Sequence, residues 1–128
     1  MESLKDRVAI VTGASRGIGL AVAAELVRQG AKVCVTARRP ESLAEAVAEL
    51  GGSDVAIAVP GRADDAGHQA EAVARTIETF GRLDMLVNNT GINPVYGPVL
   101  DADPAAAAKI FAVNVLAPLA WTRRARDA

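Results

Sequence analysis

The chain has 128 residues, of which 51% are hydrophobic and 23% charged, and its formal net charge is −1 at pH 7. This composition is typical of one globular domain and excludes a disordered chain, while the near-zero charge excludes nucleic-acid binding by bulk electrostatics. A single cysteine, Cys34, excludes an intrachain disulfide framework, and no run reaches the roughly 18 apolar residues of a membrane span, so we expect a cytoplasmic protein without a membrane partner.

Short aliphatic runs alternate with longer segments of helical periodicity. The runs predict strands because each is too short for a helix. They are residues 8–11, 32–37, 55–59 and 83–87. The segments after the first three runs predict helices, each with an apolar stripe on one face. These stripes are Ile18, Val22 and Leu26, then Leu43, Val47 and Leu50, then Val73, Ile77 and Phe80.

Residues that begin or end helices complete this pattern. Pro40 fits the first turn of the second helix, and Asp64 or Asp65 can cap the third. Residues 91–102 predict a loop, and a last helix begins at Asp103-Pro104 and runs toward Arg124. Strands that alternate with helices predict a parallel sheet covered on both faces. We therefore expect an α/β fold, a partial Rossmann-type doubly wound sheet of about four strands, whose fourth strand is an exposed apolar edge.

A glycine-rich turn, Thr12-Gly13-Ala14-Ser15-Arg16-Gly17-Ile18-Gly19, joins the first strand to the first helix. Glycines at this place permit a tight reversal, close approach of the backbone to a phosphate, and close packing of helix on strand. The N–H groups at the helix start favour an anion. An ordinary tight turn is the alternative interpretation.

Three motifs carry a resemblance to a family. The turn Thr12-Gly13-x-x-x-Gly17-x-Gly19, the block Asn88-Asn89-Thr90-Gly91 and Asn114 within 111–115 follow one another in the chain. Together they resemble the classical short-chain dehydrogenases/reductases, and the sequence is also similar to 3-oxoacyl-carrier-protein reductase-like members. The resemblance implies a set of cofactor-binding residues: Gly13, Ser15, Arg16, Gly17, Ile18, Gly19, Arg38, Arg39, Ala63, Asn89, Thr90 and Gly91.

The end of the second strand bears on which nicotinamide is bound. A carboxylate there accepts hydrogen bonds from a ribose 2′-OH, but this chain has Ala37-Arg38-Arg39. Guanidinium groups pair with a 2′-phosphate instead, and Arg16 can close on the same group. We therefore favour NADP(H) over NAD(H). The alternative is that the two arginines are a solvated pair before a helix.

The chain departs from the family after the third strand. The family carries an acidic residue or asparagine there, then an apolar residue, around the adenine, whereas this chain has Arg62-Ala63. We expect Arg62 to be solvated, and a backbone contact from Ala63 to adenine to remain.

Asn114 is a candidate catalytic residue. Pro118 has no N–H to donate to the Asn114 carbonyl, which predicts a free acceptor and a local kink. The resemblance implies that Asn114 belongs to a catalytic tetrad. The alternative is a polar residue satisfied within a bent helix.

The rest of the tetrad, a serine and a Tyr-x-x-x-Lys pair, is not found in these residues, because the single tyrosine, Tyr96, is followed four residues later by Leu100.

His68 has no second histidine or cysteine beside it, so no metal site is expected. The resemblance also implies that Trp121 lies at a subunit interface, whereas Cys34 is expected in the core.

The leading hypothesis is that residues 1–128 are the NADP(H)-binding Rossmann-type portion of a short-chain oxidoreductase and lack its C-terminal catalytic strand and helix. The parent protein would transfer a hydride between the nicotinamide and a small-molecule carbonyl or alcohol. A homo-oligomer is expected. The alternatives are a dinucleotide-binding module without turnover and a truncated chain without activity.

Overall fold

The computed structural model describes residues 3–91, 101 and 103–128. Most of the loop predicted over 91–102 therefore lies outside the described residues, together with Tyr96. The strands are β1 (Val8–Thr12), β2 (Lys32–Ala37), β3 (Ala56–Pro60) and β4 (Met85–Val87). The helices are α1 (Gly17–Arg28), α2 (Pro40–Leu50), α3 (Ala66–Phe80), α4 (Pro104–Phe111) and α5 (Ala117–Arg126), and a π-helical turn, η2 (Ala112–Leu116), joins the last two.

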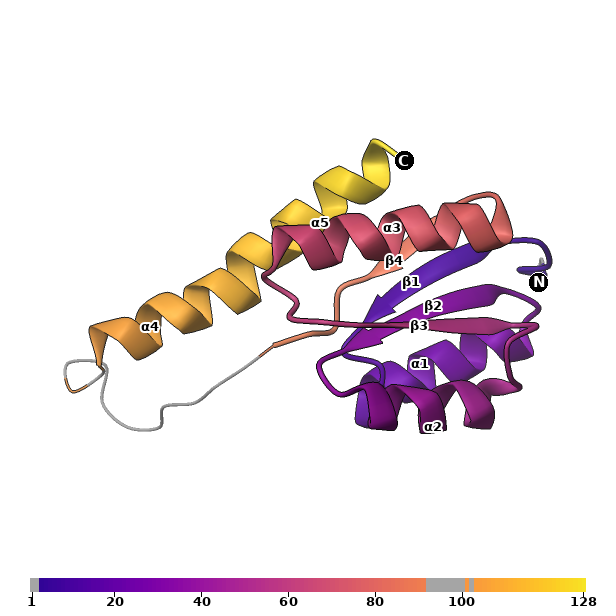
Figure 1. The fold of residues 1–128 in the computed structure, drawn as a ribbon, viewed down its shortest axis with the longest axis horizontal. Coiled ribbons are helices and arrows are strands. Elements are labelled where there is room, and N and C mark those ends of the chain that lie inside the picture. Colours follow the sequence, from indigo (N-terminus) through magenta and orange to yellow (C-terminus); the bar gives the residue numbers. More distant parts are fainter. Residues whose placement is uncertain (1–2, 92–100, 102) are drawn as a thin grey trace.

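The four strands form one parallel sheet in the order β3-β2-β1-β4. Helices α1 and α2 cover one face, and α3 and α5 cover the other (Figure 1). Successive residues of β1 point to opposite faces, so Ala9 and Val11 pack in the α1–α2 layer whereas Ile10 packs with Ala72 and Trp121. The expected α/β Rossmann-type fold with four strands is confirmed.

The buried faces of two helices differ from the predicted stripes. In α1 the buried residues are Gly19 and Ala23, while Ile18 is 75% exposed. Small residues bring α1 close to the sheet, and this leaves no place for a large side chain at the first turn.

In α3 the predicted stripe of Val73, Ile77 and Phe80 is only half-buried. The buried residues of this helix are His68, Gln69, Ala72 and Thr76. The reason is that α3 contacts both the sheet and α5, so its covered face includes polar positions. The Thr76 hydroxyl is satisfied by donating to the Ala72 carbonyl at 2.7 Å.

The last helix contains the irregularity expected from its proline. Residues 112–116 form the π-helical turn around Asn114, and the N–H of Ala117 donates to the Ala112 carbonyl. Pro118 lacks an N–H, so the regular α-helical ladder is broken here. The predicted kink therefore takes the form of a π-turn. Beyond it, α5 packs on α3, whereas α4 extends past the sheet (Figure 1).

This helix also bears on the expectation that no run is long enough to span a membrane. The helical segment Pro104–Arg126 is 23 residues long and contains an 18-residue stretch with a mean hydropathy of 1.4, so it is long and apolar enough to cross a membrane by length and composition. Of this stretch, 17% is buried inside the protein, including Ala117 and Trp121. Its other large apolar side chains, Phe111, Val115, Leu116 and Leu119, are exposed.

Candidate functional site

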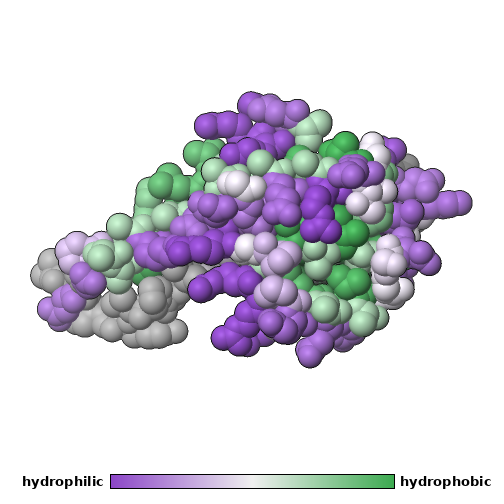
Figure 2. Space-filling model, viewed as in Figure 1, coloured by the Kyte–Doolittle hydropathy of each residue, from purple (hydrophilic) through white to green (hydrophobic). Residues whose placement is uncertain are grey.

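A pocket of about 660 Å³ opens at the carboxyl ends of the strands. Ligands of open α/β sheets bind at this edge. Figure 2 shows hydrophilic side chains around the hollow between the projecting α4 and the body of the protein. The pocket is lined by Gly13, Ser15, Arg16, Gly17, Ile18, Thr36, Ala37, Arg38, Arg39, Ser42, Gly61, Arg62, Ala63, Asp64, Asn89, Thr90, Gly91, Lys109 and Val113.

This lining contains all the predicted cofactor residues except Gly19. A Cβ at Gly19 would lie 2.3 Å from the Gly13 carbonyl oxygen, so Gly19 supports the turn from behind. Gly17 has φ +60 and nothing within 4 Å of an added Cβ. The first turn of α1 has no acidic residue, and its N-cap, Arg16, makes no side-chain cap. The helix start therefore keeps N–H groups and a positive field for an anion.

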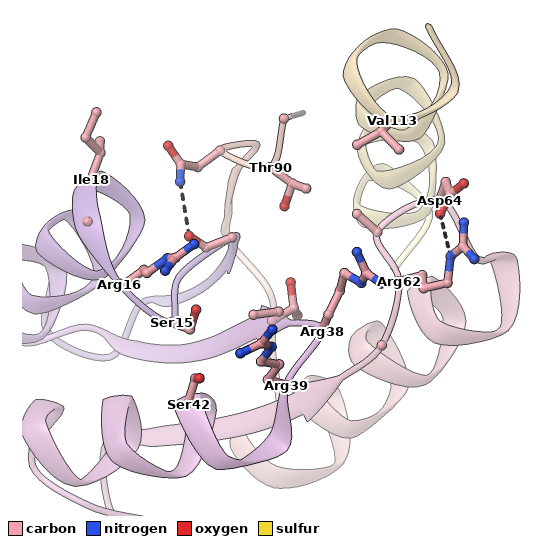
Figure 3. A pocket seen from close by; sticks show the side chains of 18 of the residues that line it. Ser15, Arg16, Ile18, Arg38, Arg39, Ser42, Arg62, Asp64, Thr90 and Val113 are labelled. Carbon is pink, nitrogen blue, oxygen red and sulfur yellow. Dashed lines mark hydrogen bonds and ion pairs between the residues drawn. The ribbon is translucent and has the colours of Figure 1, made fainter. Parts of the chain in front are cut away.

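The Thr12 hydroxyl joins the glycine turn to the end of β4. It accepts the N–H groups of Asn89 at 3.0 Å and Thr90 at 3.2 Å and donates to the Val87 carbonyl at 3.4 Å. The Asn89 amide donates to the Gly13 carbonyl at 3.2 Å, a contact drawn in Figure 3. Sequence reasoning missed this role of Thr12, although a hydroxyl residue directly before the first glycine is a signal for it.

The side of the pocket next to β2 and α2 is cationic. Arg16, Arg38 and Arg39 lie there with two hydroxyl residues, Ser15 and Ser42 (Figure 3). Within the part of the chain that the structure describes, none of the three arginines forms an ion pair. Guanidinium groups without a carboxylate partner suit a phosphate, which they bind with charge-assisted hydrogen bonds.

The opposite side carries the one carboxylate of the described lining, Asp64. Its Oδ2 accepts from the Lys109 ammonium at 2.7 Å, and its Oδ1 lies 3.5 Å from Nε of the Arg62 guanidinium. The hydrogen bond from Lys109 lowers the pKa of Asp64, so the carboxylate stays ionised and paired with Lys109. Arg62 is exposed, as the sequence predicts.

Asn114 does not line the pocket, and its side chain is exposed. A Cβ at Gly91 would lie 3.4 Å from its Oδ1, so the Asn114 side chain is adjacent to the Gly91 end of the pocket. Its membership of a catalytic tetrad stays a prediction. The Asn88 amide donates to the Thr122 hydroxyl at 3.3 Å, which joins the end of β4 to α5.

Trp121 and His68 lie in the core instead of at the surface. Trp121 is 1% exposed, and its indole N–H donates to the Ala63 carbonyl at 3.0 Å. The implied interface position of Trp121 does not agree with this burial. His68 packs edge-on against the indole, 5.6 Å between ring centroids, and neither of its ring nitrogens has a hydrogen-bond partner among the described residues. Desolvation lowers the pKa of His68.

Comparison with known proteins matches most of this chain to one family. The family model described as short chain dehydrogenase matches residues 7–128. The chain is 37% identical over 121 residues to dehydrogenase/reductase SDR family member 4 of Caenorhabditis elegans, covering 93% of this chain and 46% of that protein. It is 46% identical over 100 residues to an L-rhamnose 1-dehydrogenase (NAD(P)(+)) of Azotobacter vinelandii, covering 73% and 38%.

Solved structures show the same likeness. A metagenomic short-chain oxidoreductase in complex with NADP superposes with a TM-score of 0.86 at 37% identity, covering 96% of this chain and 56% of that one. A short-chain dehydrogenase/reductase from Brucella melitensis superposes with a TM-score of 0.92 at 28% identity, covering 100% and 54%. The chain thus spans about half the length of the proteins it resembles.

Proposed function

The chain belongs to the short-chain dehydrogenase/reductase family, and from this premise we propose that residues 1–128 bind NADP(H) for an oxidoreductase acting on a small-molecule carbonyl or alcohol. The observation that carries the proposal is the cationic side of the pocket. Arg38 follows β2 at the position where a carboxylate selects a ribose 2′-OH, and the described structure supplies none there. The solved relative in complex with NADP also supports this choice.

The described residues fit a dinucleotide along the whole pocket. The glycine turn and the start of α1 would hold the pyrophosphate, because Gly17 leaves open space where a side chain would stand. Arg38, with Arg16 or Arg39, would hold the 2′-phosphate. Asn89 and Thr90 would border the nicotinamide ribose, since the Thr12 hydroxyl fixes their backbone.

The bound nicotinamide would supply the hydride that the carbonyl or alcohol exchanges. The part of the protein described here binds and orients the dinucleotide. Asn114 would join the catalytic groups, and the tyrosine and lysine that the resemblance implies are not provided by this segment. The segment is thus proposed as the cofactor-binding portion of a larger catalytic unit, in a cytoplasmic homo-oligomer without a nucleic-acid or membrane partner.

The sequence also led to two narrower hypotheses. The likeness to 3-oxoacyl-carrier-protein reductases stays a prediction from the sequence. A protein that binds a dinucleotide without turnover is not favoured, because the relatives described above are named as dehydrogenases and oxidoreductases.

The test is a comparison of cofactor affinities in the unaltered protein. NADPH and NADH are titrated separately, and binding is followed by the change in nicotinamide fluorescence. We expect NADPH to bind at least about tenfold more tightly, because a charge-assisted contact to the 2′-phosphate is worth about 1.5–3 kcal/mol. Equal affinities would contradict the NADP(H) assignment, and no binding of either would contradict the proposed function.

A further inference from the structure

The carbonyl of Ala63 is held from two elements at once. The Trp121 indole N–H donates to it from α5 at 3.0 Å, and the Gln69 side-chain amide donates to it from α3 at 2.9 Å. Trp121 is 1% exposed and Gln69 is 3% exposed. These bonds are therefore shielded from water, and breaking one leaves a buried polar group without its partner.

Both donors are themselves oriented by neighbours. The Gln69 carbonyl oxygen accepts from the Arg124 guanidinium at 3.1 Å, which fixes the amide so that its NH₂ group faces Ala63. The Trp121 ring is set by its edge-on contact with His68. A third connection joins the same segment to the long helix that α4, η2 and α5 form together (residues 104–126), since Lys109 pairs with Asp64 at 2.7 Å. The segment after β3 is thus fastened to α3 and to the long helix.

The side chains of this segment after β3 offer few contacts to an adenine, so the position of its backbone matters for binding. Arg62 stands where the family has an acidic residue or asparagine, and its exposed guanidinium is turned to Asp64 (Figure 3). Ala63 lines the pocket, and within the described residues its N–H donates no hydrogen bond. The backbone of Ala63 is therefore the polar group left to meet the adenine, and its position depends on its carbonyl bonds.

We propose that Trp121 is a positioning residue for the adenine end of the dinucleotide, and that it acts through the Ala63 carbonyl. This inference rests on the proposed function. The buried indole N–H holds the backbone of the segment after β3 in position, and this segment lacks an acidic side chain that could contact the adenine. Gln69 does the same from α3.

The test separates the two ends of the cofactor with fragment ligands. Trp121→Phe keeps an aromatic ring against His68 but removes the N–H donor. We expect the affinity for 2′,5′-ADP, which carries only the adenosine end, to fall about fivefold, the loss typical of one hydrogen bond. The affinity for reduced nicotinamide mononucleotide is expected to stay unchanged. Hydrogen exchange of the amides at 62–65 is expected to become faster.

Two further variants complete the design. Gln69→Met removes the other donor from a different helix and is expected to weaken 2′,5′-ADP binding in the same way, so the test survives if Trp121→Phe does not fold. Arg123→Ala, an exposed change on α5, is expected to leave both fragment affinities unaltered.

The outcomes are distinct. Unchanged 2′,5′-ADP affinity in both Trp121→Phe and Gln69→Met would overturn the positioning role, and so would an equal loss of affinity for both fragments, which would show a general loss of stability. If the unaltered protein binds neither NADPH nor 2′,5′-ADP, the proposed function itself fails, and the inference fails with it.

Discussion

At the scale of single residues, the proposal of NADP(H) over NAD(H) depends on the arginines after β2. We predict that Arg38→Ala weakens NADPH binding about tenfold or more and leaves NADH binding unchanged, because only NADPH carries the 2′-phosphate. Titration with each cofactor checks this. Arg123→Ala on α5 is the matched control for the loss of one positive charge. A similar loss of both cofactors in Arg38→Ala would sink the assignment.

The two glycines of the turn are predicted to respond differently to alanine. A Cβ at Gly19 meets the Gly13 carbonyl oxygen at 2.3 Å, so Gly19→Ala must displace backbone. Gly17→Ala meets open space and is strained by its φ of +60 alone, which costs about 1–2 kcal/mol. We expect the larger drop in the free energy of unfolding for Gly19→Ala, measured by urea denaturation. Equal drops would contradict the close approach of α1 to the turn.

At the scale of elements, one hydroxyl connects β1 to the end of β4. We predict that Thr12→Val lowers the free energy of unfolding by about 1–3 kcal/mol, because the N–H groups of Asn89 and Thr90 lose their acceptor. Thr12→Ser keeps the hydroxyl and is the control. Urea denaturation of the three proteins checks this, and a Thr12→Val protein as stable as the Ser variant would refute the role of the hydroxyl.

The packing of α3 against α5 carries a pH dependence. His68 is buried between Gly61 and Trp121, and desolvation lowers its pKa below the ordinary 6.5 despite the nearby Glu71 and Asp65. The folded state therefore prefers the neutral ring. The unfolded state takes up the proton first, so this contribution to stability is complete above about pH 6.5 and declines as the pH falls through 6.5 toward the folded value.

Replacing this histidine tests the effect directly. It is the chain's single histidine, so His68→Leu removes all histidine titration. We expect the melting temperature of the variant to fall less between pH 7.5 and about pH 5.5 than that of the unaltered protein. Parallel melting curves across this range would show that the His68 environment does not shift its pKa.

At the scale of the whole molecule, the exposed apolar surface of the long helix dominates. Phe111, Val115, Leu116 and Leu119 are each about half exposed or more, and β4 lies at the edge of the described sheet. Contiguous apolar surface and open strand edges favour association. This supports the proposal of a homo-oligomer.

We predict that the 128-residue chain associates in solution and that Phe111→Asp with Leu119→Asp shifts it toward the monomer. Size-exclusion chromatography with light scattering measures the mass. Ser53→Asp together with Ala24→Asp, two exposed positions on the side of the sheet covered by α1 and α2, gives the control for added negative charge. A monodisperse monomer of the unaltered chain would contradict the prediction.

The sequence by itself determined the element order, the parallel sheet and the place of the pocket. Local signals were sufficient for β2 and α2, whose predicted bounds, Lys32–Ala37 and Pro40–Leu50, agree with the structure. These features depend on hydrophobic period, proline and glycine, which act over a few neighbouring residues. The glycine spacing located the turn that lines the pocket for the same reason.

Only the tertiary structure decided which helix faces are covered and how the pocket is held together. Ile18 is exposed because Gly19 and Ala23 bring α1 close to the sheet. The Trp121 indole N–H donates a hydrogen bond to the carbonyl of Ala63, which lies 58 residues earlier in the chain. Periodicity records how hydrophobic a residue is but not what lies opposite it, and such long-range contacts arise only when the layers of the fold meet.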